Sequence, residues 1–120
     1  MAKILIVEDS EPVANMYQRQ LEADGHKVVR AANGKIGLAK VKSENPDLVL
    51  LDIILPEISG LDFLAKIQSS PDTKKIPVVA VSAFGSEENQ KKALELGSKE
   101  FIEKENVNPS DVVKIVNKYL

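Results

Sequence analysis

Residues 47–56 read DLVLLDIILP, and this stretch decides the fold of the chain. Leu48 to Leu51 is an unbroken run of apolar side chains, which is typical of a strand covered on both faces in a parallel sheet. Asp52 follows directly, at the carboxyl end of that run. An ionised carboxylate in apolar surroundings is costly unless it is paired, hydrogen-bonded or near a metal, so we expect Asp52 to have partners elsewhere in the chain.

The composition predicts one compact domain over residues 1–120, because 43% of the 120 residues are hydrophobic. A net charge of -2 gives no large basic field, which argues against direct binding of nucleic acid. The absence of cysteine excludes disulfides and cysteine-ligated metals, and it fits a reducing compartment. The apolar stretch Ile4–Val7 is too short for an export signal or a membrane span, so we expect a soluble cytoplasmic protein without membrane contact.

Short apolar runs and helical spacing alternate along the rest of the chain. Further strands are predicted over residues 3–7, 27–31, 76–81 and 99–103. Helices are predicted from Ser10 to Gly25, through Ile36 to Val41, from Leu61 to Ile67, from Ser86 to Leu96 and from Asn108 to Tyr119. With right-handed crossovers, this order predicts an α/β fold, a doubly wound five-stranded parallel sheet with five helices of the flavodoxin-like type.

Two local expectations concern how the first two helices begin. Ser10 is expected to cap the first helix, with Pro12 in its first turn. Asn33-Gly34 is expected to form the turn that leads into the second helix, which runs through Ile36, Ala39, Lys40 and Val41.

The predicted site lies at the carboxyl ends of the strands, where open parallel sheets bind their ligands. The residues that fall there are Glu8, Asp9, Asp52, Ser82 and Lys104. Three crowded carboxylates repel one another, and a hard cation with oxygen ligands relieves this repulsion, so we expect Mg²⁺ as the cofactor.

A phosphoryl group fits the same set of residues. Mg²⁺ commonly combines one or two carboxylates with phosphate oxygens. Lys104 would supply a positive charge and Ser82 a hydroxyl donor to the oxygens of a transferring phosphoryl group. Asp52 is then the expected nucleophile, and the product is an acyl phosphate.

Four stretches carry a resemblance to a known family. They are residues 4–10 (ILIVEDS), 47–60 (DLVLLDIILPEISG), 77–83 (PVVAVSA) and 101–104 (FIEK). Together they resemble the receiver domain of the two-component response regulators, of which the single-domain chemotaxis-type proteins are the simplest members.

The resemblance implies a role for each site residue. Asp52 would accept a phosphoryl group from a sensor histidine kinase or a phosphotransfer protein. Asp9 and Asp52 would bind Mg²⁺ with the main-chain carbonyl of Ile54, and Glu8 would assist. Ser82 and Lys104 would hold the phosphoryl oxygens.

The resemblance also implies a switch. Phe101 would change rotamer together with Ser82, and a downstream protein would bind the face formed by the fourth helix, the last strand and the fifth helix. Phosphorylation-dependent dimerisation is compatible with this scheme. The protein would not be an enzyme beyond the self-catalysed transfer to its own Asp52.

The chain departs from the family pattern at two positions. Leu55 stands where methionine usually precedes the proline, which is a conservative apolar change. Glu105 follows Lys104, where the family usually has proline in a cis peptide. A cis bond before a residue other than proline costs ~3 kcal/mol, so we expect a trans bond and a different path into the last helix.

In the fold that the resemblance implies, Ile54 and Phe84, each two positions beyond a site residue, would flank the mouth of the phosphoryl pocket. Both are apolar. They would hinder the attacking water, which predicts an acyl phosphate that lasts for many minutes.

Other classes of function remain open at this stage. The chain could act alone, or be a receiver domain excised from a longer regulator or hybrid kinase. A flavodoxin-like cofactor carrier would need a phosphate cradle where Glu8 and Asp9 stand. An aspartate-nucleophile hydrolase typically needs an acid where Ile54 lies, and an inert receiver-shaped scaffold is disfavoured because the whole set of site residues is present.

Overall fold

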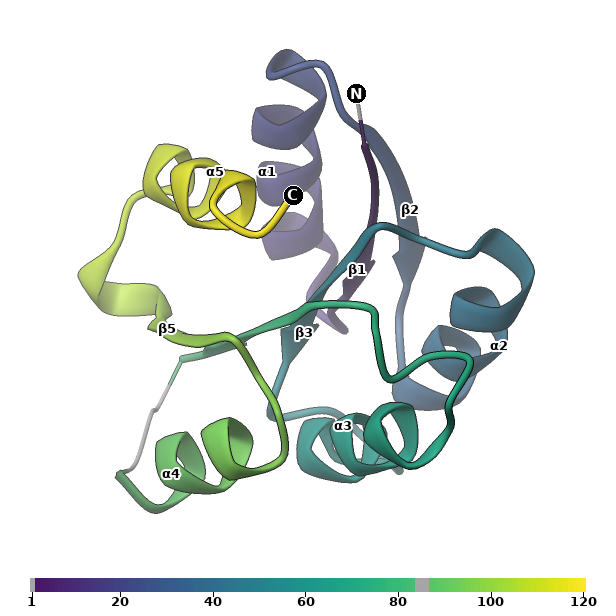
Figure 1. Ribbon diagram of the computed structural model, residues 1–120. Helices are drawn as coiled ribbons and strands as arrows, with labels where there is room; N and C mark the ends of the chain where they lie inside the picture. Colours follow the sequence, from purple (N-terminus) through teal and green to yellow (C-terminus); the bar gives the residue numbers. More distant parts are fainter. Residues whose placement is uncertain (1, 84–86) are drawn as a thin grey trace.

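The computed structural model describes residues 2–83 and 87–120. Five parallel strands form one sheet in the order β2-β1-β3-β4-β5 (Figure 1). The strands are β1 (Lys3–Val7), β2 (Lys27–Ala31), β3 (Leu48–Asp52), β4 (Val78–Ser82) and β5 (Glu100–Glu103). The predicted doubly wound parallel sheet is therefore confirmed.

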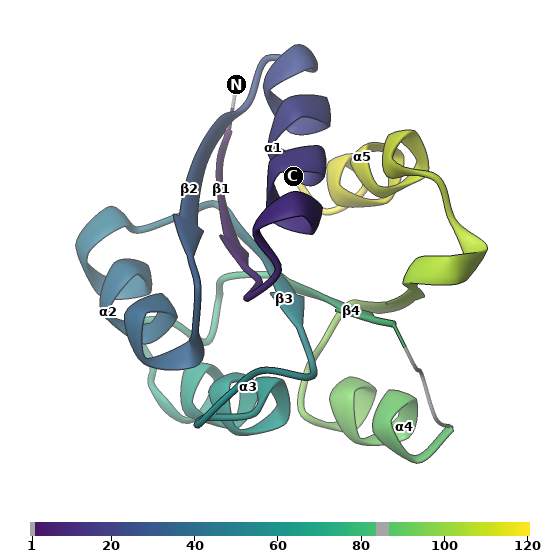
Figure 2. The same cartoon turned by 180° about the vertical axis from the view of Figure 1, so that it is seen from behind.

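Helices cover both faces of the sheet, as the two opposite views show (Figures 1 and 2). One face carries α1 (Glu11–Ala23) and α5 (Pro109–Asn117), and the other carries α2 (Gly34–Glu44), α3 (Gly60–Ser69) and α4 (Glu87–Glu95). A short 3-10 helix, η1 (Lys104–Asn106), connects β5 to α5. No helix in the described ranges is long and apolar enough to cross a bilayer.

Strand β3 is the centre of the fold, since every residue from Leu48 to Asp52 is buried. It pairs with β1 on one side, where Val7 lies opposite Leu51, and with β4 on the other, where Val81 lies opposite Asp52. Side chains alternate along the strand between the two apolar layers, because successive residues of a strand point to opposite faces. Both sides of β3 are covered, as the apolar run of the sequence predicted.

Helix α1 begins without the predicted side-chain cap. Ser10 occupies the N-cap position, but its hydroxyl makes no capping hydrogen bond. Instead, the backbone N–H of Ser10 donates to Oε2 of Glu8 at 3.2 Å. The start of α1 thus helps to orient a site carboxylate.

Helix α2 packs on the sheet through a side that contains two glycines. Ile36 and Ala39 are exposed, whereas Gly34, Gly37 and Val41 are buried. The glycines allow a close approach to the sheet, since a Cβ on Gly37 would lie 2.9 Å from the Phe63 ring and 3.1 Å from Val7.

The connection from β5 to α5 contains the trans peptide bond that was expected at Glu105. No cis peptide bond occurs in the described part of the chain, so Lys104 and Glu105 are joined by a trans bond. The backbone turns there through η1, and Nδ2 of Asn106 donates to Oε2 of Glu103 at 2.8 Å. Helix α5 then begins at Pro109, where the N–H of Asn108 donates to the carboxylate of Asp111 at 3.1 Å.

Candidate functional site

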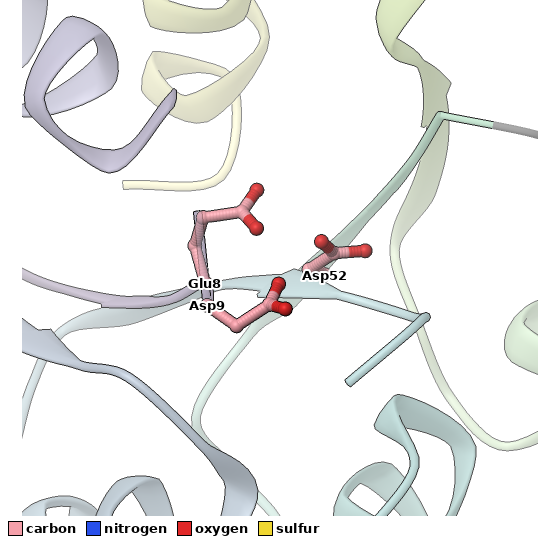
Figure 3. A group of neighbouring side chains, drawn as sticks. All are labelled: Glu8, Asp9 and Asp52. Atoms are coloured by element: carbon pink, nitrogen blue, oxygen red, sulfur yellow. The ribbon is translucent and has the colours of Figure 1, made fainter. Parts of the chain in front are cut away.

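The carboxyl ends of β1, β3 and β5 bring four of the predicted residues together, with β4 lying between β3 and β5. Glu8 and Asp9 follow β1, Asp52 ends β3, and Lys104 follows β5. Figure 3 shows the three acids converging on one space, and each offers a carboxylate oxygen within 4.8 Å of the others. Glu8 and Asp52 are buried, while Asp9 is exposed.

Lys104 joins the two buried acids. Its Nζ donates to Oε1 of Glu8 at 2.6 Å and to Oδ2 of Asp52 at 3.1 Å. Its side chain is only 17% exposed, so the ammonium group lies inside the acidic cluster rather than in solvent. With a trans peptide bond to Glu105, the Lys104 side chain still reaches both carboxylates.

Burial shifts the pKa values of Glu8 and Lys104 in opposite directions. Burial raises the pKa of Glu8 above its ordinary value, and the neighbouring Asp52 raises it further, against the opposing effect of Lys104. For Lys104, burial lowers the pKa, but the hydrogen bond to Glu8 and the charge of Asp52 outweigh burial and leave the pKa raised. Lys104 therefore stays protonated and supplies the positive charge of the site.

The carboxylate of Asp52 is fixed at both oxygens. The backbone N–H of Ile54 donates to Oδ1 at 3.0 Å, and Lys104 approaches Oδ2. Ile54 is 51% exposed, so an apolar residue lies at the surface two positions beyond Asp52. Phe84, the other residue expected at this rim, lies outside the described residues.

Ser82 ends β4 next to Asp52, one strand away. Its residue is fully buried, and among the described residues its Oγ is the one buried side-chain oxygen or nitrogen without a hydrogen-bond partner. A buried hydroxyl without a partner costs ~1–3 kcal/mol. This orphaned donor suits an incoming anionic oxygen.

The donor set fits a hard divalent cation. Three carboxylates supply oxygen only, which suits Mg²⁺ or Mn²⁺ better than a soft metal. The exposed position of Asp9 leaves that side of the cluster open for water ligands. The proposed contribution of the Ile54 carbonyl stays a prediction.

Phe101 lies on β5, opposite Ala80 of β4. It is partly buried and packs against the apolar layer that faces α2, α3 and α4. This position fits both ordinary packing and a change of rotamer, so its switch role stays a prediction.

Two residues at the site were not singled out from the sequence. A Cβ on Gly60 would lie 2.4 Å from the backbone oxygen of Asp52 and from Cα of Ile53, so only glycine fits there. Tyr17 of α1 is buried, which raises its pKa, and the charge of Lys104 lowers it in part, which places its phenol within electrostatic reach of the site. The glycine after a strand and loop was a usable signal of close backbone approach, whereas Tyr17 looked like any core aromatic.

Comparison with known proteins identifies the family. The family model of the response regulator receiver domain matches residues 4–117. The chain is 32% identical to protein PilH of Pseudomonas aeruginosa over 120 residues, which is 100% of this chain and 98% of PilH.

Solved structures give the same picture. The chain superposes on the chemotaxis protein CheY4 of Vibrio cholerae with a TM-score of 0.92 at 27% identity, covering 100% of this chain and 99% of CheY4. It also matches the Mn²⁺-bound form of the response regulator Rcp1 with a TM-score of 0.83 at 31% identity, covering 98% of this chain and 91% of that one.

Proposed function

Because the chain belongs to the response regulator receiver domain family, we propose that it is a phosphorylation-controlled switch of two-component signalling. Asp52 accepts the phosphoryl group, and a sensor histidine kinase or phosphotransfer protein donates it. The observation that carries the proposal is the placement of Asp52 at the end of the central strand, where the ammonium group of Lys104 bridges its carboxylate and that of Glu8.

The transfer itself is an in-line displacement at phosphorus. A carboxylate oxygen of Asp52 forms the new O–P bond, the P–N bond to the donor histidine breaks, and its electron pair leaves with the imidazole. Lys104 is already 3.1 Å from Oδ2 of Asp52, so a small shift lets it bind a phosphoryl oxygen instead. Ser82 donates its unpaired hydroxyl to another oxygen.

A divalent cation, when bound, would neutralise part of the charge that builds up on the transferring phosphoryl group. Glu8, Asp9 and Asp52 would hold it, with the main-chain carbonyl of Ile54. We propose Mg²⁺, supported by the all-oxygen donor set and by the Mn²⁺-bound form of the relative Rcp1.

The output is a change of protein contacts. Movement of Ser82 toward the phosphoryl group pulls the end of β4, and Phe101, on the adjoining strand, changes rotamer in response. A downstream protein, or a second copy of the chain, then binds the face of α4, β5 and α5. On this proposal the chain catalyses only its own modification, acts in the cytoplasm and needs no direct contact with nucleic acid.

The flavin-carrier alternative is not favoured. Glu8 and Asp9 stand where a carrier would place phosphate-binding groups, and their charges would repel a phosphate. A flavin absorbance band in the purified protein would revive that alternative.

The direct test is intact mass spectrometry after incubation with acetyl phosphate. We expect one added phosphoryl group that requires Mg²⁺ and disappears in Asp52→Asn. The matched control is Asp47→Asn, which removes the acid at the other end of the same stretch and should leave the modification unchanged. A modification that survives in Asp52→Asn, or its absence in the unaltered protein, contradicts the proposal.

A further inference from the structure

Three segments that are far apart in the chain meet at His26, at the edge of the sheet opposite Asp52. They are the start of β1 at Ala2, the loop between α1 and β2 at Asp24, and the end of α5 at Asn117. The His26 side chain is only 10% exposed. The proposed function does not use this residue, which is the one histidine of the chain.

Hydrogen bonds occupy both nitrogens of the His26 ring. The backbone N–H of Ala2 donates to Nδ1 at 3.3 Å, and Nε2 lies 2.8 Å from Oδ1 of Asn117. Because a backbone N–H can only donate, Nδ1 accepts and the ring proton lies on Nε2. The ring is therefore held as its neutral Nε2–H tautomer.

The Asn117 amide has the orientation that this tautomer requires. Its Nδ2 donates to Oδ2 of Asp24 at 2.8 Å, so its Oδ1 faces the ring and accepts from Nε2. An ionised carboxylate only accepts, which fixes this end of the network. The hydrogen bonds therefore run in one direction, from Ala2 through His26 and Asn117 to Asp24.

A second proton on the ring is incompatible with this arrangement. An imidazolium donates from both nitrogens, so a proton on Nδ1 would face the N–H of Ala2 and end that hydrogen bond. Oδ2 of Asp24 lies 3.4 Å from Nε2 and attracts a positive ring. Protonated His26 therefore leaves Ala2 and competes with Asn117 for the Asp24 carboxylate.

Two other ionisable side chains border the ring. Asp47 and Tyr119 line the surface hollow of about 490 Å³ beside His26, which gives the ring access to protons from solvent. Asp47 already accepts the backbone N–H of Lys3 at 2.8 Å. Tyr119 already donates to Oε1 of Glu100 at 2.8 Å.

The lysines nearest to this network in the chain do not oppose a positive ring. Lys27 is exposed to solvent, and the ammonium group of Lys3 pairs with Glu44 at 3.3 Å. Asp24 is thus the charged group that acts most directly on protonated His26, and its attraction offsets part of the loss of the Ala2 hydrogen bond.

We propose that His26 is a pH-sensitive clasp that fastens the end of α5 to the start of β1. The neutral ring holds Ala2 and Asn117, and the imidazolium that forms as the pH falls releases Ala2 and moves toward Asp24. Histidine changes its charge between about pH 5 and pH 8, so acidification from neutral pH opens the clasp. If α5 belongs to the partner-binding face, as the proposed function has it, acidification loosens one edge of that face.

Nuclear magnetic resonance of the labelled full chain tests the clasp. The nitrogen shifts of the ring distinguish the two neutral tautomers from each other and from the imidazolium. We expect the Nε2–H tautomer at about pH 8. As the pH falls, the backbone amide of Ala2 and the side-chain amide of Asn117 should shift with the same midpoint as the ring.

The variant His26→Gln separates the ring from other titrating groups. Glutamine can accept the N–H of Ala2 and donate to Asn117, but it takes up no proton, so the pH-dependent shifts at both positions should fall at least about fivefold. The matched control is Lys27→Gln, which changes the exposed neighbour and should alter these shifts by less than about twofold.

Three outcomes overturn the proposal: an Nδ1–H tautomer at about pH 8, an Ala2 amide that does not follow the titration of the ring, or an equally large pH-dependent shift in His26→Gln. Circular dichroism of the variants shows that they are folded. Phosphorylation of Asp52 plays no part in this test, so the proposed function and the clasp can fail separately.

Discussion

Glu8 and Lys104 are 96 positions apart in the chain, and their side chains meet at 2.6 Å at the end of the sheet. Asp52 lies on the other side of the same ammonium group. The lysine thus partly neutralises the acids before any ligand arrives, so a metal ion has to bind in competition with a resident positive charge.

Lys104→Met should tighten metal binding by the unphosphorylated protein. Removing a charge close to two carboxylates strengthens the attraction of the cluster for a cation, by roughly threefold to tenfold at a moderate effective dielectric. Isothermal titration with Mg²⁺ or Mn²⁺ measures the change. Lys114→Met, an exposed lysine on α5, serves as the control; unchanged or weaker binding in Lys104→Met contradicts the competition.

Ser82→Ala should stabilise the unphosphorylated fold while impairing the switch. The Ser82 hydroxyl is buried without a partner, and its removal should raise the free energy of unfolding by ~1 kcal/mol. The Ser98 hydroxyl, in contrast, donates to the backbone oxygen of Glu100 at 2.7 Å, so Ser98→Ala should lower that free energy by ~1 kcal/mol. Urea unfolding compares the two, and a loss of stability in Ser82→Ala goes against the assignment.

Gly60→Ala should destabilise the fold strongly. The new Cβ would lie 2.4 Å from backbone atoms of Asp52 and Ile53, which cannot move aside as a flexible side chain can, so we expect a loss of about 2–4 kcal/mol. Gly25→Ala is the comparison. Gly25 has a φ of +91° but no atom within 4 Å of the added Cβ, so it should lose only ~1 kcal/mol. Equal losses would show that the close approach at Gly60 carries no special penalty.

Ile54→Asn should shorten the life of the acyl phosphate. An amide side chain can hold and orient the attacking water, whereas the exposed isoleucine cannot. We expect loss of phosphate over many minutes in the unaltered protein and a several-fold faster loss in Ile54→Asn, with Phe84→Glu as a second variant. Release of labelled phosphate measures both rates. Loss of phosphate within seconds from the unaltered protein would contradict the role of Ile54 in hindering the attacking water.

The sequence predicted the central features of this structure because they depend on strong local patterns. Strands 3–7 and 27–31 match the structure to the residue. Asp52 was recognised because a carboxylate at the end of a buried apolar run requires partners. The parallel topology then placed Glu8 and Asp9 beside it.

Other features depend on tertiary packing that no local pattern encodes. Glu8 is the closest partner of Lys104 because the two side chains extend toward each other from the ends of β1 and β5. The burial of Gly37 follows from the shape of Val7 and Phe63 beneath α2. The hydrogen bond from the backbone N–H of Ser10 to Glu8 depends on where the Glu8 side chain lies in the assembled site, so it could not be predicted from the local sequence.

Lys104 directly follows β5, so the position of its positive charge in the site depends on a strand at the edge of the sheet. β5 is an edge strand with a single neighbour, β4, so it has half the ladder of β3 to hold it in place. Local opening is cheapest where the fewest backbone hydrogen bonds must break. Lys104, whose positive charge partly neutralises the acidic cluster, therefore follows a strand that can open locally while the acids stay in place at the ends of β1 and β3. Amide hydrogen exchange would detect this opening as faster exchange in β5 than in β1 and β3.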